Sequence, residues 1–130
     1  MRAGLMTDYP NFPVSELRCK CPCGQNLMAA GFMARLQMLR TKLGFPFPIT
    51  SAYRCPDHNE RVSSTGRNGP HTYGCAVDIA VSGQRAYQII QGAARDFSGI
   101  GIKQHGPHEG RFIHLDTLAG SKRPWIWSYE

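Results

Sequence analysis

The chain has 130 residues, of which 42% are hydrophobic and 18% are charged. This length and composition predict one globular domain over residues 1–130 and exclude a disordered chain. Fifteen Lys and Arg against nine Asp and Glu give a net charge of +6, which favours a polyanionic neighbour. Because the basic residues are spread along the chain, without a run of interleaved aromatics, we expect no nucleic acid as a partner.

No stretch approaches the roughly 18 apolar residues of a membrane span, so we expect no membrane insertion. Residues 1–8 lack the apolar core of a signal peptide, which predicts a chain made in the cytoplasm. We expect it to act as a monomer.

Five cysteines are an odd number, and three of them stand one residue apart at Cys19, Cys21 and Cys23. Together with Cys55 they offer four sulfur ligands for zinc, but zinc sites commonly have two-residue gaps within each pair. We therefore favour reduced thiols packed near the surface over a metal site.

The first predicted segment, residues 1–25, is an irregular arm, because prolines and Gly24 interrupt any period. Residues 27–43 carry apolar side chains three and four apart, which predicts an amphipathic helix that ends at Gly44. A short strand at 48–53 and a polar, glycine-rich loop at 57–70 follow.

The second half predicts a strand at 76–81, a helix at 84–97, and strands at 100–103 and 112–115 joined by a turn. The tail, in which Trp125 and Trp127 alternate around Ile126, fits either an edge strand or an aromatic plug. We expect an α+β fold in which two main helices pack on an antiparallel sheet.

Two pairs of polar residues are the candidate chemistry. His71 and Asp78 flank Gly74, and His114 and Asp116 lie in a segment that is otherwise apolar. Charge in a buried strand is costly unless it is compensated, and a metal ion would compensate it. Two nitrogen ligands and one oxygen ligand, with a fourth position for water, suit a catalytic zinc ion.

Four stretches resemble the M15 zinc peptidases, which cut peptidoglycan peptides and share their fold with hedgehog signalling domains. The stretches are residues 49–54, 71–78, 99–101 and 112–117. The resemblance runs from about Ser15 to Trp125. It implies that zinc is held by three residues: His71, Asp78 and His114.

The same resemblance implies that Arg54 binds a substrate carboxylate or stabilises the oxyanion, with Tyr73 also contacting substrate. The alternative for Arg54 is a surface arginine paired with Asp57. Two positions depart from the family pattern. Gly69 stands where many relatives have a serine, and Arg111 stands where many have the carboxylate that acts as general base.

The general base must therefore come from elsewhere. Asp116 lies two residues beyond His114, so both side chains project to one face of a strand. We favour Asp116, either as the base or as the group that orients a ligand. Glu109 and then His108, in the preceding turn, are the next choices.

The predicted function is zinc-dependent hydrolysis of peptidoglycan stem peptides. The enzyme would be a phage endolysin or a D-Ala-D-Ala carboxypeptidase or endopeptidase, acting on the cell wall after release during phage lysis. The alternative, which Arg111 keeps open, is a catalytically inactive zinc-fold module that binds the wall or a protein partner.

Overall fold

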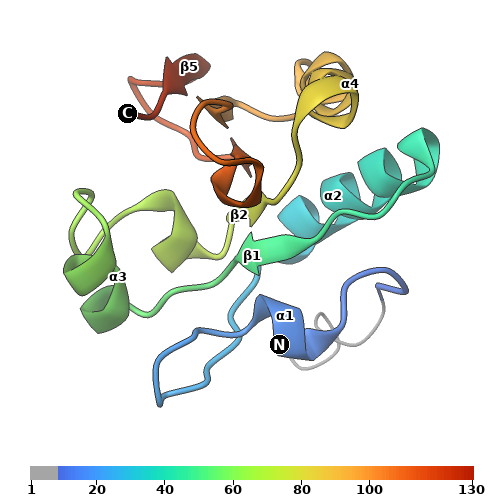
Figure 1. Cartoon of the computed structure of the whole chain (residues 1–130). Helices are drawn as coiled ribbons and strands as arrows, with labels where there is room; N and C mark the ends of the chain where they lie inside the picture. Colours follow the sequence, from blue (N-terminus) through green and yellow to red (C-terminus); the bar gives the residue numbers. More distant parts are fainter. Residues whose placement is uncertain (1–8) are drawn as a thin grey trace.

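The computed structural model describes residues 9–130, which form an α+β fold around a five-stranded sheet (Figure 1). The expected fold class is therefore confirmed. The strand order is β1-β2-β4-β3-β5. The strands are β1 Ile49–Ser51, β2 Ala76–Ile79, β3 Gly99–Lys103, β4 Phe112–Asp116 and β5 Trp125–Ser128. The expectations for residues 1–8 fall outside the described part of the chain.

The last strand makes the sheet mixed rather than wholly antiparallel. β1, β2, β4 and β3 pair antiparallel in that order, but β5 runs parallel to β3. The reason lies in the connection after β4: this strand ends beside Gly99, and Trp125 also pairs with Gly99. The tail therefore crosses to the far side of β3 and runs opposite to β4. Of the two expectations for the tail, the edge strand is the one observed.

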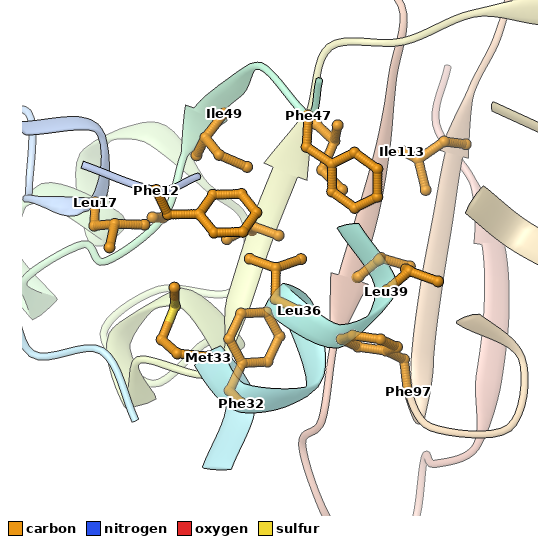
Figure 2. Close-up of a cluster of buried hydrophobic side chains, with 14 of the residues drawn as sticks. Phe12, Leu17, Phe32, Met33, Leu36, Leu39, Phe47, Ile49, Phe97 and Ile113 are labelled. Carbon is orange, nitrogen blue, oxygen red and sulfur yellow. The ribbon is translucent and has the colours of Figure 1, made fainter. Parts of the chain in front are cut away.

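Two long helices cover the core as expected. α2 spans Ala30–Leu43, three residues shorter than the predicted helix, and ends at Gly44 with a left-handed φ of 78°. α4 spans Gly83–Ala93 and stops before Phe97. Figure 2 shows side chains of α2 in one buried cluster with Ile49 of β1 and Ile113 of β4. The α2 residues of this cluster are Phe32, Met33, Leu36 and Leu39.

Four shorter helices of residues 9–130 were not predicted. The N-terminal arm contains α1, Val14–Leu17, and the predicted loop contains α3, Pro56–Val62. α3 forms because Pro56 occupies a first-turn position that needs no N–H, and the Cys55 sulfur accepts the N–H of His58. Its sequence looked like a loop because only Asn59 of its seven residues is buried. The turn before β4 contains the short helix η3, His108–Gly110.

His71 also lies on an element that was predicted as loop. It belongs to η2, Pro70–Tyr73, which Gly74 ends in the left-handed conformation just before β2. None of the helices in residues 9–130 is long and apolar enough to cross a membrane.

Candidate active site

The register of the sheet brings the candidate ligands together. Asp78 on β2 lies directly opposite His114 on β4, and η2 delivers His71 beside them. Alternate residues of a strand face opposite sides, so Asp116 shares the face of His114 while Leu115 points into the core. Ligand atoms of His71, Asp78 and His114 all lie within 4.8 Å of one another.

Each histidine is fixed through one ring nitrogen and presents the other to Asp78. His71 donates from Nδ1 to the carbonyl oxygen of Ala52 at 2.7 Å, which leaves Nε2 3.4 Å from Asp78 Oδ1. His114 places Nδ1 3.0 Å from the same oxygen. Two nitrogens and one carboxylate oxygen thus converge on one point, as a metal site requires.

Asp116 lies on the other side of the His114 ring and is fully buried. Its Oδ2 is 2.7 Å from His114 Nε2, and Arg123 donates to both carboxylate oxygens at 2.8 and 3.0 Å. The backbone N–H of Leu118 donates to Oδ1 at 3.1 Å. Every oxygen of Asp116 is therefore engaged, and the carboxylate holds His114 with Nδ1 toward Asp78.

These contacts keep both carboxylates ionised. Burial would raise the pKa of Asp78, but hydrogen bonds from His114 and His71 hold it below its usual range. Burial opposes ionisation of Asp116 too, yet hydrogen bonds from His114 and Arg123 bring its pKa to about 2. Burial lowers the pKa of His114, and the bonds to Asp116 and Asp78 outweigh it, so the pKa is raised. This concentration of negative charge suits a cation.

The three converging side chains line a cleft of about 710 Å³. Six other lining residues give it basic and aromatic walls: Arg54, Lys122, Arg123, Trp125, Trp127 and Tyr129. The Trp127 ring lies 5.2 Å from the His114 ring, between centroids, and the Arg123 guanidinium stacks 5.0 Å from the centroid of Trp127. The cleft therefore offers contacts to both charged and apolar parts of a ligand.

Glycines of β3 make room for this wall. Gly101 pairs with Trp127, and a Cβ at Gly101 would stand 2.7 Å from the Trp127 Nε1. A Cβ at Gly99 would clash with the carboxylate of Asp116. The sequence did carry a signal for this wall: glycines stand two residues apart at 99 and 101, and aromatic residues stand two residues apart at 125, 127 and 129. No role at the site was predicted for the aromatic residues.

The family model for peptidase M15 matches residues 10–116. The chain belongs to the M15 peptidase family. The match includes every candidate metal ligand and Arg54 but ends before Arg123 and the aromatic wall of β5. No curated protein matched the chain.

M15 peptidases are in general zinc-dependent, and the residues present fit such an ion. His71 and His114 have their second ring nitrogens bound to a carbonyl and a carboxylate, the arrangement that usually fixes zinc-ligating histidines. Asp78 supplies the oxygen donor. All three line the cleft, so the side of the site away from the sheet is open.

Arg54 lies at the edge of this M15 site. Its Nη2 is 3.7 Å from Asp78 Oδ2, while Ser51 and the buried Asn59 accept hydrogen bonds from Nε and Nη1 at 3.1 and 2.9 Å. The alternative pairing with Asp57 is not observed, because Asp57 pairs with Arg67. Asn59, which sequence reasoning missed, thus fixes the guanidinium in the cleft.

At Gly69, where the chain departs from the family pattern, a neighbouring side chain occupies the space beside the backbone. The space that a Cβ at position 69 would take is filled by the side chain of Thr65. Thr65 also lines the cleft and accepts a hydrogen bond from Asn59 at 2.8 Å. A hydroxyl from another part of the chain therefore stands next to the position where many relatives carry serine.

The other predicted residues lie away from the cleft lining. Glu109 and His108 are exposed on η3, where His108 Nδ1 is 3.4 Å from the Ser82 hydroxyl. Tyr73 is 55% exposed and does not line the cleft. Arg111 donates to the carbonyl oxygen of Gly106 at 2.9 Å, within the turn.

Proposed function

We propose that the chain is a zinc-dependent peptidase that hydrolyses peptidoglycan stem peptides. The observation that carries this proposal is the convergence of His71 Nε2, Asp78 Oδ1 and His114 Nδ1 at one side of a basic and aromatic cleft. A zinc ion held there would polarise the scissile carbonyl and bring the pKa of a water molecule toward neutrality.

The chain's own groups have separate tasks in this reaction. Arg54 binds a substrate carboxylate or stabilises the oxyanion, because its fork of N–H donors is fixed beside Asp78. Asp116 acts as a positioning residue that orients His114, since none of its oxygens is free to take a proton from the cleft. Tyr129 lines the cleft and can donate a hydrogen bond from its neutral phenol to substrate, and burial raises the pKa of that phenol further.

Glu130 is the proposed general base. Of the residues that line the cleft, Asp78 and Glu130 are the carboxylates, and Asp78 is already a metal ligand. A base must reach the water that attacks the peptide carbonyl. Glu130, Glu109 and His108 are all exposed, but Glu130 lines the cleft whereas Glu109 and His108 lie on η3 outside its lining.

The finer assignment is a phage endolysin peptidase or a D-Ala-D-Ala carboxypeptidase or endopeptidase. Peptidoglycan is its partner, and the chain acts on the wall as a monomer after release from the cell. The net charge of +6 supports an anionic wall as the target, and Arg54 and Lys122 in the cleft support a substrate with carboxylate groups.

Digestion of purified peptidoglycan, followed by mass spectrometry of the fragments, tests the proposal. We expect release of D-Ala or of new amino termini that stops with a chelator and returns with added zinc. His71→Ala and His114→Ala should abolish it, whereas Glu109→Gln should not. Binding to the wall without any zinc-dependent cleavage would refute the enzyme and identify the inactive binding module instead.

A further inference from the structure

Four cysteines converge away from the active site. Cys19, Cys21 and Cys23 follow α1, and Cys55 stands at the N-terminus of α3. Their sulfur atoms all lie within 4.8 Å of one another, although Cys55 stands 32 positions after Cys23 in the sequence. Such a gathering of thiols from two segments needs a physical reason.

The spacing of the sulfurs fits a tetrahedral metal site. Cys21 Sγ is 3.5 Å from Cys19 Sγ and 3.6 Å from Cys55 Sγ. Disulfide sulfurs would be about 2.05 Å apart. Four sulfurs at about 2.3 Å from one zinc ion, placed at the corners of a tetrahedron, are about 3.8 Å apart. The cysteines are free thiols, at a spacing close to that of a zinc tetrathiolate.

Backbone amides point at the sulfurs as well. The N–H of Cys55 donates to Cys19 Sγ at 3.3 Å, that of Cys23 to Cys21 Sγ at 3.4 Å, and that of His58 to Cys55 Sγ at 3.4 Å. These donors favour thiolates over neutral thiols. Four thiolates at this spacing would repel one another strongly, and a cation among them removes that repulsion.

We propose that Cys19, Cys21, Cys23 and Cys55 hold a second zinc ion in a closed, structural site. The one-residue gaps, which argued against zinc in the sequence, are accommodated because the chain turns back at Gly24, whose φ is 59° and whose N–H donates to the carbonyl oxygen of Cys21. Zinc binding releases the thiol protons to solvent, and no redox change is involved.

This site would fasten the N-terminal segment to the beginning of α3. Cys55 directly follows Arg54, and the N–H of Tyr53 donates to the carbonyl oxygen of Leu17 at 3.1 Å. This hydrogen bond also joins the N-terminal segment to the residues just before α3. Four protein ligands leave no position for water or substrate, so the ion has a structural and not a catalytic role. Its loss would loosen the wall of the cleft that carries Arg54.

Zinc content of the whole purified chain, expressed with Zn²⁺ in the medium, tests the proposal by elemental analysis. We expect two ions per chain in the natural sequence and one in the double variant His71→Ala/His114→Ala. Adding Cys23→Ser to that double variant should remove the remaining ion. Cys23 is exposed, so this change disturbs packing least. The matched control is Cys75→Ser, which changes the cysteine outside the cluster and should keep the ion.

X-ray absorption at the zinc edge of the double variant supplies a second readout that needs no cysteine substitution. We expect four sulfur neighbours at about 2.3 Å. Three results would each overturn the proposal. They are a double variant that contains no zinc, a zinc content that Cys23→Ser leaves unchanged, and a protein mass lower by two hydrogens, which reveals a disulfide. Because the active-site histidines are absent from this background, the result does not depend on the proposed peptidase function.

Discussion

At the scale of single residues, each site histidine is oriented through the ring nitrogen that faces away from Asp78. His71 is fixed by a backbone carbonyl and His114 by Asp116, which is itself held by Arg123. The resemblance to M15 peptidases predicted the three converging residues, and their side-chain types suit zinc. It left the role of Asp116 open, because the partner that engages it, Arg123, lies in a stretch without any recognisable motif.

Asp116→Asn tests the orienting role. The amide cannot provide the negative charge that aligns His114 and pairs with Arg123, so we expect the apparent zinc affinity of the active site to fall about 10- to 100-fold. Hydrolysis measured against free zinc, set with a metal buffer, reports this affinity at the active site alone. Asp57→Asn is the control, because Asp57 forms an exposed ion pair with Arg67 outside the cleft lining. Unchanged zinc dependence in Asp116→Asn would remove the orienting role.

Glu130→Gln tests the general base. If Glu130 takes the proton from water, this change should lower kcat about 10²- to 10⁴-fold with little effect on bound zinc. Glu109→Gln makes the same chemical change at the base favoured second from the sequence, and it should leave kcat nearly unchanged. The opposite result, with Glu109→Gln inactive and Glu130→Gln active, would identify Glu109, in the turn before β4, as the general base. Single-turnover rates on a stem peptide distinguish the two.

At the scale of elements, periodicity predicted the segments that bury one face and missed those that do not. α2 and α4 have apolar stripes, and β2 and β4 have apolar residues against the core, so their positions followed from pattern. α3 buries only Asn59 and is stabilised by its N-terminal residues and by contacts with η2, which a hydrophobic pattern does not record. The parallel pairing of β5 depends on a chain crossing that local sequence cannot encode.

Gly101→Ala tests whether β3 makes room for the aromatic wall. The added Cβ would meet both Trp127 and Tyr129 at 2.7 to 2.8 Å, so the rings must move. We expect a loss of about 1–3 kcal/mol in the free energy of unfolding, together with reduced peptidase activity. Gly31→Ala on α2 is the matched control, because its Cβ would meet nothing within 4 Å. It should stabilise the chain by up to about 1 kcal/mol. Thermal unfolding of both variants checks the contrast, and equal stability would show that the wall yields freely.

At the scale of the whole molecule, the sheet separates stability from chemistry. One face of β2 and β4 packs its apolar residues with α2 and α4, while the other carries the ionised groups beneath the cleft. The apolar core therefore lies on the face opposite the charges that the site needs, and hydrogen bonds from His114, His71 and Arg123 offset the burial of the two carboxylates themselves. The net charge of +6 belongs to this same scale, because in the proposed function it would attract a large anionic substrate before any residue of the cleft makes contact.

Ionic strength should therefore affect large and small substrates differently. The Debye length is about 30 Å at 0.01 M salt and about 3 Å at 1 M, so high salt screens the attraction between the basic chain and an anionic wall. We expect hydrolysis of intact sacculi to fall about 10-fold or more across this range, as steered association does. Cleavage of a short, soluble stem peptide should change far less, because its approach involves few charges and its binding depends on contacts inside the cleft. Rates on both substrates, measured side by side with zinc held constant, check this contrast. Equal salt dependence on the two would show that the net charge has no part in reaching the wall.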